Sequence, residues 1–113
     1  MTLKALRELG RRWQAHLRLA DWTIKFDFMT KAHSKEHPEW NGFVVWDDQH
    51  HSASIRISKD AQDITHALVH ELMHIRLEGH VPMEEANTSS NWEFVMNTMA
   101  TVLTGVCISG IET

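Results

Sequence analysis

The residues with the clearest chemical potential are His70, Glu71 and His74, which form the pattern His-Glu-x-x-His. Residues four apart lie on one face of a helix, so two imidazoles at this spacing can bind one metal ion. Zn²⁺ accepts imidazole nitrogens, prefers a tetrahedral set of ligands and keeps a water molecule at a catalytic site. The metal lowers the pKa of that water to about 7, and a neighbouring carboxylate can accept its proton. We therefore predict that His70 and His74 bind Zn²⁺ and that Glu71 is the general base of a hydrolase.

The same pattern can also occur without a metal. The chain contains nine His among 113 residues, so two exposed His on a surface helix are the alternative interpretation. The context favours the metal site, because the apolar residues 67–69 precede the pattern within an amphipathic helical periodicity.

A catalytic zinc site needs a third protein ligand, and two residues are candidates. Glu93 lies in the next predicted helix, after a loop that can turn the chain back toward the metal. However, Ser90-x-x-Glu93 is also a capping box, in which Glu93 would bind only the first amide of its helix. His80 follows His74 at the spacing of a longer three-His pattern, but that pattern needs Gly where this chain has Leu77. We favour Glu93 and keep His80 as the alternative.

Two further polar residues lie near the predicted ligands. Asn97 is one helical turn beyond Glu93, so it is predicted to hydrogen-bond a metal-binding His and fix its ring. His66 begins the row that continues at His70 and His74, but each four-residue step drifts by about 40° around the helix. We therefore expect His66 to be a neighbour of the site and not a ligand.

Hydrophobic periodicity predicts the elements that position these residues. Apolar residues at three- and four-residue spacing predict a helix over about residues 2–19. Strict alternation predicts strands at 22–28 and 53–58, and a short apolar run predicts another at 43–46. Residues 30–41 are polar and are predicted to form a loop. The second and third strands are close in sequence and are expected to form a hairpin.

The helix that carries the His pair is predicted to begin after Asp60 or Asp63 and to end at Gly79. Residues 80–90 are predicted to form a loop, and a last helix is predicted over about residues 91–103. The order of helix, three strands, helix and helix indicates a single α+β domain.

The five Trp residues have two kinds of position in these patterns. Trp13, Trp22 and Trp46 fall on apolar periods and are predicted to lie in the core. Trp40 and Trp92 stand at the edges of segments, where packing is the preferred interpretation over lining a substrate groove.

The composition limits the partners and the location. The net charge is −4 and no basic stripe is present, which disfavours a nucleic acid as partner. No apolar run is long enough to span a membrane, and the N-terminus lacks the apolar segment of a secretory signal. The single cysteine, Cys107, excludes an intramolecular disulfide. We expect one cytoplasmic domain over residues 1–113, without membrane partners.

Together these features resemble the gluzincin branch of the zincin metallopeptidases, most closely the minigluzincins and small phage-type metallopeptidase-like proteins. The resemblance rests on Asp21–Ile24, Ala53–Ile57, Ala67–His74 and Glu93–Asn97, and it covers nearly the whole chain. Only the His-Glu-x-x-His pattern is highly specific.

The resemblance implies a zincin-like α+β fold with a three-stranded, mostly antiparallel, twisted sheet. It implies Zn²⁺ bound by His70, His74 and Glu93, with Glu71 as the base. Asn97 corresponds to the residue that supports a ligand His in this family.

The implied function is zinc-dependent hydrolysis of a peptide or protein held as an extended strand at a sheet edge. The third predicted strand, residues 53–58, is the expected edge. Larger family members use a His or Tyr from a C-terminal subdomain to stabilise the oxyanion, whereas this chain contains no Tyr. This departure predicts weak or latent activity, and the alternative is a zinc-stabilised peptide-binding module without catalysis.

Overall fold

The computed structural model describes residues 1–85 and 90–105, with the side chains of residues 90–95 left out. Within these residues the predicted order of helix, three strands, helix and helix is confirmed, with two short helices in addition. The elements are α1 (Leu3–His16), β1 (Thr23–Phe28), α2 (Lys31–Glu36), β2 (Gly42–Asp47), β3 (Ser52–Ile57), α3 (Ile64–Glu78), the 3₁₀ helix η1 (Met83–Glu85) and α4 (Ser90–Thr104).

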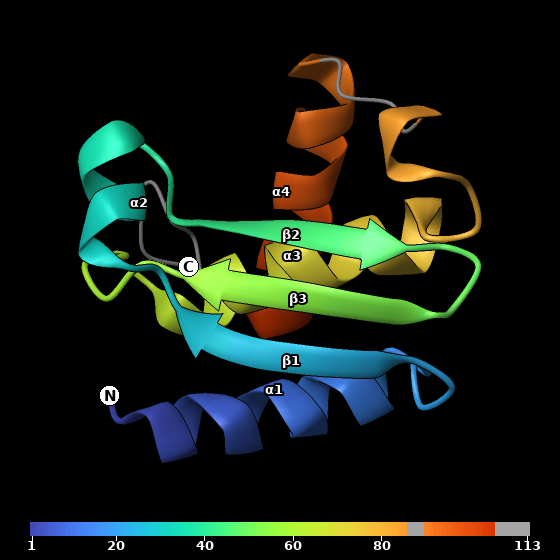
Figure 1. The fold of residues 1–113 in the computed structure, drawn as a ribbon, viewed down its shortest axis with the longest axis horizontal. Helices are drawn as coiled ribbons and strands as arrows, with labels where there is room; N and C mark the ends of the chain where they lie inside the picture. The colour runs from blue at the N-terminus through green and yellow to red at the C-terminus, as the bar shows by residue number, and fades with distance from the viewer. Residues whose placement is uncertain (86–89, 106–113) are drawn as a thin grey trace.

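The three strands form one mixed sheet in the order β1-β3-β2 (Figure 1). β2 and β3 are antiparallel, with Gly42 opposite Ile57, so the predicted hairpin is confirmed. β1 is parallel to β3, with Thr23 opposite Ser52. The prediction of a mostly antiparallel sheet is therefore wrong.

The mixed sheet follows from the length of the connection between β1 and β2. Residues 29–41 reverse the direction of the chain, but they are too long for a tight hairpin. β1 and β2 therefore stand apart, and the β2–β3 turn folds β3 back into the gap between them. The expectation that residues 53–58 form a sheet edge is wrong, because β3 is the central strand and β2 is an edge.

The connection before β2 is not a plain loop, because it contains α2. The side chain of Thr30 accepts a hydrogen bond from the backbone of His33 at 3.1 Å, and the ring of His33 binds the Thr30 amide in return. This reciprocal pair satisfies the free amides at the start of the helix. Sequence periodicity missed α2 because none of its residues is buried, so it has no apolar stripe to detect.

The turn between β2 and β3 is organised by Asp47. Its carboxylate accepts hydrogen bonds from the backbone of Gln49 at 3.0 Å and of His50 at 3.3 Å. The ring of His50 also lies 2.7 Å from the second carboxylate oxygen. This hydrogen bond raises the pKa of His50 and lowers the pKa of Asp47 from their ordinary values.

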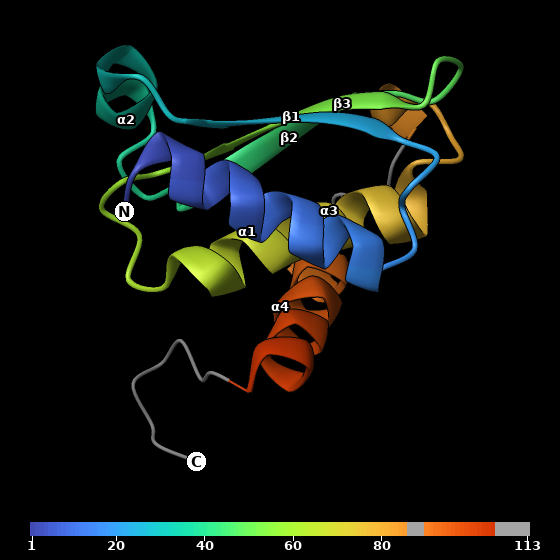
Figure 2. The ribbon, with the colours of Figure 1, turned by 90° about the horizontal axis from the view of Figure 1, so that it is seen from below.

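The main core lies between one face of the sheet and the helices α1 and α3 (Figure 2). Phe26, Val44 and Ile55 project from the three strands into this core, whereas Lys25 and Val45 lie on the opposite face and are exposed. The alternation of apolar and polar residues along the strands is thus confirmed, because one face of the sheet is buried and the other is exposed to solvent.

The helix α3 lies in the middle of the molecule, between the sheet and α4 (Figure 2). Leu68 and Leu72 are fully buried in the core beneath the sheet. Val69 and Met73 pack instead in a second cluster with Met96 and Ala100 of α4. Because it has neighbours on two sides, α3 is apolar around most of its circumference.

The Trp residues predicted to lie in the core do so. Trp22 and Trp46 are buried, and Trp13 packs against both clusters. Trp40 is 40% exposed. The side chain of Trp92 lies outside the described residues.

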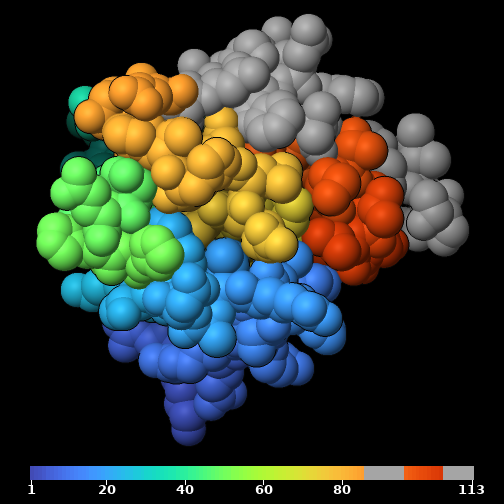
Figure 3. Space-filling view, turned by 90° about the vertical axis from the view of Figure 1, so that its right-hand side faces the viewer, coloured from blue at the N-terminus to red at the C-terminus, as the bar shows by residue number. Residues whose placement is uncertain are grey.

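The C-terminal end of α3 reaches the surface between the β2–β3 turn and α4, beside η1 (Figure 3). Gly79 ends the helix with its amide donating to the carbonyl of Ile75 at 2.8 Å, as predicted. Among the described residues, no helix is both long and apolar enough to cross a membrane.

Candidate functional site

The helix α3 holds the His pair on an unbroken run of backbone. Asp63, and not Asp60, is the N-cap, because its carboxylate accepts the amide of His66 at 2.9 Å. His70 and His74 therefore lie one helical turn apart, with their ring centroids 5.0 Å apart and the rings inclined by 73°. This geometry brings both imidazoles to one side of the helix, as the four-residue spacing predicts.

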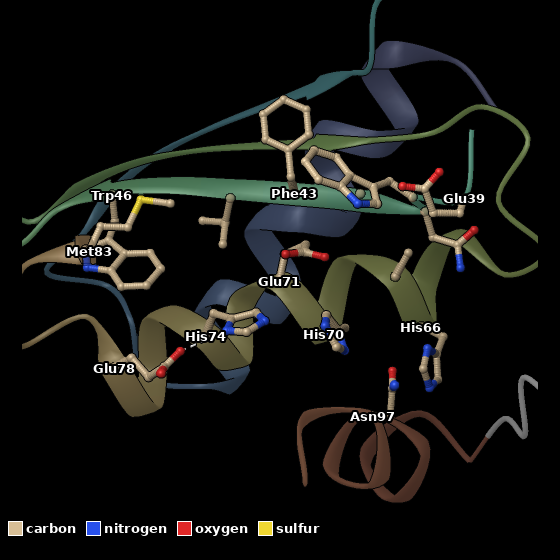
Figure 4. Close-up of a pocket in the computed structure, with 15 residues that line it drawn as sticks. Glu39, Phe43, Trp46, His66, His70, Glu71, His74, Glu78, Met83 and Asn97 are labelled. Atoms are coloured by element: carbon tan, nitrogen blue, oxygen red, sulfur yellow. Dashed lines mark hydrogen bonds and ion pairs between the residues drawn. The ribbon is translucent and has the colours of Figure 1, made fainter. Parts of the chain in front are cut away.

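Glu71 completes a compact group with the two His. One donor atom from each of His70, Glu71 and His74 lies within 4.8 Å of the others. The side chain of Glu71 is buried and points from α3 toward β2 (Figure 4). The structure thus brings together the three residues that the sequence identified, and zinc itself remains a prediction.

Glu78 continues the row along α3 and holds the ring of His74. Nδ1 of His74 lies 2.9 Å from Oε2 of Glu78, with the two side chains 12% and 6% exposed. A carboxylate accepts hydrogen bonds, so this contact favours the tautomer that carries the ring hydrogen on Nδ1. Nε2 then keeps its lone pair, which is the form in which a His binds a metal. The donor set therefore fits a divalent cation such as zinc.

Sequence analysis missed Glu78, although a signal for it was present. Glu78 stands four residues after His74, the spacing at which helical side chains meet. A metal-binding His commonly donates its second ring nitrogen to a carboxylate. Together these two rules identify Glu78 as a partner of His74.

The predicted third ligand, Glu93, falls on α4, but its side chain lies outside the described residues. Asn97, one turn further, is exposed and lines the same cleft as His70. It points from α4 toward the α3 row (Figure 4). Because Glu78 already holds Nδ1 of His74, a supporting role for Asn97 would concern His70.

His80, the alternative third ligand, lies just after the end of α3. Its side chain is exposed, and it does not line the cleft that contains His70 and His74. Within the described residues, it is also absent from the group of close donor atoms. The structure therefore does not bring His80 to the two ligand His.

His66 connects α3 to α4 beside the site. It is 3% exposed, and its Nε2 lies 3.1 Å from Oγ1 of Thr101. Together with the apolar contacts between the two helices, this hydrogen bond fixes the helix that carries Glu93 and Asn97. His66 thus helps to hold α4 against α3 beside the site.

A cleft of about 500 Å³ opens over these residues, between β2 and the helices α3 and α4. Trp46 and Met83 form one end, and Glu39 lies at the other, with Glu71 between them (Figure 4). Trp40 also lines the cleft while its ring stacks on His37, so it packs as predicted and borders the cleft as well. Sequence periodicity could not predict the position of Trp40, because Trp40 lies between α2 and β2 and therefore on neither face of a strand.

Gly42, the first residue of β2, lies beside Glu71 at the cleft. A Cβ atom at this position would lie 2.9 Å from the carbonyl oxygen of Arg56 and 3.6 Å from Cγ of Glu71. A Cβ at position 42 would therefore clash with the backbone of Arg56 but would only touch the side chain of Glu71. The glycine leaves the floor of the cleft open beside Glu71.

Comparisons with protein-family models, with curated proteins and with solved structures found no match to this chain. The likeness to gluzincins therefore stays a prediction from the residues, and the geometry of the cleft carries the argument for function.

Proposed function

We propose that this protein is a zinc-dependent peptidase in which His70, His74 and Glu93 bind the metal and Glu71 is the general base. The observation that supports this proposal best is the close group of His70, Glu71 and His74 on the floor of a cleft. The hydrogen bond from His74 to Glu78 adds to it, because it prepares the ring nitrogen that faces the metal.

A bound zinc ion would act as a Lewis acid and lower the pKa of a water molecule in the cleft. The carboxylate of Glu71 accepts a proton from that water as it attacks the peptide carbonyl carbon. Glu71 then donates the proton to the nitrogen of the leaving amine. Its buried position, under Gly42, keeps the carboxylate close to the substrate backbone.

The edge of β2 provides a place for the substrate backbone. Within the part of the chain that the structure describes, β2 pairs with β3 alone, so its outer edge can pair with an extended peptide. Gly42, Val44 and Trp46 of this strand line the cleft, so an added strand would pass over Glu71. The substrate edge is thus β2, in place of the third strand expected from the sequence.

A zinc-stabilised module that binds a peptide without cleaving it is the second candidate. It is favoured by the lining of the cleft, because the described residues there include no Tyr, Lys or Arg that could stabilise an oxyanion. His66, which does line the cleft, is already engaged with Thr101. The two candidates share the metal and the peptide, and they differ only in the role of Glu71.

Metal content tests the site. Elemental analysis of the wild type is expected to find zinc at one ion per chain, and binding should be lost in His70→Ala and weakened in Glu93→Ala. Binding should persist in Glu71→Gln and in His80→Ala, which serve as controls because neither residue is a proposed ligand. Wild-type protein without zinc affinity, or zinc binding indifferent to His70, contradicts the metal site.

Cleavage separates the two candidates. A fluorogenic peptide library is expected to be cleaved by the zinc-loaded wild type and at least about 100-fold more slowly by Glu71→Gln, the usual effect of removing a general base. Equal cleavage by both proteins excludes Glu71 as the base. Zinc binding and peptide binding without any cleavage by the wild type would support the non-catalytic module.

A further inference from the structure

The described side chains that line the cleft include three Glu and three His, and no Lys or Arg. The three Glu are Glu39, Glu71 and Glu78. Glu84 and Glu85 of η1 are exposed next to the end formed by Met83. The proposed metal would offset the charges of Glu71 and Glu78. The exposed carboxylates Glu39, Glu84 and Glu85 are therefore the ones that would repel an acidic occupant and attract a basic one.

The basic residues of the chain gather elsewhere. Six of its eleven Lys and Arg residues fall within residues 4–25, in or near α1 and β1. These elements lie on the side of β3 away from β2 (Figure 1). The charge of the molecule is thus polarised across the sheet, which steers positively charged partners toward the cleft.

At one end of the cleft a carboxylate stands beside an exposed aromatic ring. Glu39 is 66% exposed, and it has no role in holding the His pair or in the proton transfer. Trp40 stacks on His37, with centroids 3.6 Å apart and planes inclined by 5°, and its centroid lies 5.8 Å from that of Phe43. His37 covers one face of Trp40, so the Glu39 carboxylate is the main contact for a guanidinium or ammonium group, and the exposed part of Trp40 can pack against the aliphatic stem of that side chain.

The competing contact for Glu39 is weak. Nδ1 of His37 lies 3.9 Å from its carboxylate, at the limit of an ion pair and between two exposed side chains. Exposed ion pairs of this kind contribute about 0–1 kcal/mol to stability. A bidentate guanidinium from a bound peptide would therefore replace this contact readily.

The other end of the cleft is apolar and preformed. The ring of Trp46 is fixed by a hydrogen bond from Nε1 to the carbonyl of Val81 at 3.0 Å. Met83, which lines the same end of the cleft, is 37% exposed, so its thioether side chain is accessible from the cleft. A wall of fixed aromatic and flexible thioether groups suits a large apolar side chain.

We propose that the cleft binds an extended basic segment of a protein, with Lys or Arg at the Glu39–Trp40 end and a large apolar residue at the Trp46–Met83 end. This inference rests on the proposed function, since it concerns the same cleft. Gly42 and Trp46 lie at the two ends of the wall that β2 forms. A strand paired with β2 has a similar rise of about 3.3 Å per residue, so the two recognised side chains are about four residues apart.

The test uses binding, so that it does not depend on catalysis. The probes are fluorescent eight-residue peptides that carry Phe and, four residues away, Arg, Gln or Glu, in both orders. Each is titrated into zinc-loaded full-length Glu71→Gln, with fluorescence polarisation as the readout. The Arg peptide is expected to bind about tenfold more tightly than the Glu peptide, with Gln between them.

Matched variants assign the preference to its residue. In the same Glu71→Gln background, Glu39→Gln should abolish the preference for Arg. Glu36→Gln should keep it, because Glu36 is an exposed carboxylate of α2 that does not line the cleft. Replacing Phe by Ala in the peptide should weaken binding in every variant.

The possible failures are distinguishable. Equal binding of the Arg and Glu peptides overturns the preference for a basic segment but not peptide binding by the cleft. If none of the peptides binds, both the preference and the peptide-binding cleft are overturned. Preference that survives Glu39→Gln overturns the assignment to Glu39. A wild type that shows the Glu39-dependent preference but cleaves no Arg peptide supports the substrate class and overturns the peptidase activity.

Discussion

Nδ1 of His74 lies 2.9 Å from Oε2 of Glu78, one helical turn further along α3, and both side chains are nearly closed to solvent. Withdrawal from water strengthens this hydrogen bond and holds the ring in one orientation. With the ring hydrogen on Nδ1, Nε2 of His74 would be the nitrogen able to bind a metal in the proposed site. In the proposed metal site Glu78 would therefore position the ring of His74 without itself binding the ion.

Replacement of Glu78 is expected to weaken zinc binding. Glu78→Ala should lower zinc affinity by about 10–100-fold, the usual effect of losing such a partner. Glu78→Gln should lower it less, because its amide oxygen can still accept the hydrogen bond from Nδ1. Competition with a chromophoric chelator measures the affinity, and circular dichroism checks the fold. Glu85→Gln is the control, because Glu85 is an exposed carboxylate of η1. Unchanged affinity in Glu78→Ala would contradict the positioning role.

Gly42→Ala is expected to destabilise the fold. The new Cβ would lie 2.9 Å from both the carbonyl oxygen of Arg56 and Cδ1 of Ile57, and a backbone atom cannot move aside cheaply. Overpacking of this kind costs about 1–3 kcal/mol. Urea unfolding of the zinc-saturated protein measures the loss. Val45→Ile adds a similar group at an exposed position of the same strand and should leave the stability unchanged. An unaltered midpoint for Gly42→Ala would show that β2 can shift at no cost.

Thr101→Val is expected to loosen α4. The substitution keeps the shape of the side chain but leaves the buried Nε2 of His66 without its hydroxyl partner. The free energy of unfolding should fall by about 1–3 kcal/mol. Thr98→Val makes the same change at an exposed position of α4 and should alter it by less than about 0.5 kcal/mol. Equal stabilities of the two variants would mean that the His66–Thr101 bond contributes nothing.

The Asp47–His50 pair is expected to stabilise the fold only over a limited pH range. Because the fold raises the pKa of His50, its contribution is complete below the ordinary value of 6.5 and is lost as the pH rises through the raised pKa. Because the fold lowers the pKa of Asp47, its contribution is complete above 3.8 and is lost as the pH falls through the lowered pKa. The pair therefore contributes fully between pH 3.8 and pH 6.5.

Proton NMR titration of His50 measures the shift directly. Its pKa should lie above 6.5 in the wild type and return toward that value in Asp47→Asn. Asn preserves the turn, since its side chain can also accept the backbone amides. Asp48→Asn removes a neighbouring charge that has no hydrogen bond to His50 and should leave most of the shift. An unshifted His50 in the wild type would contradict the hydrogen bond.

Several features could be predicted from residues alone because they depend on neighbours along the chain. The face shared by His70 and His74 follows from four-residue spacing, and the caps at Asp63 and Gly79 follow from the chemistry of helix ends. The alternation in β1 and β3 likewise follows from the two-residue period of a strand. These signals sufficed for the three main helices, the three strands and the central residues of the site.

Other features depend on contacts between distant segments, which no local period encodes. Alternation indicates which face of β3 is buried, but the parallel pairing with β1 and the exposed edge of β2 depend on how the connections pack. The position of Trp40 at the rim of the cleft has the same origin. The amino-acid sequence by itself therefore determined the chemistry of the His-Glu-x-x-His helix. Only the tertiary structure decided which strand borders it and which acidic and aromatic side chains surround it, because packing across the sheet sets both.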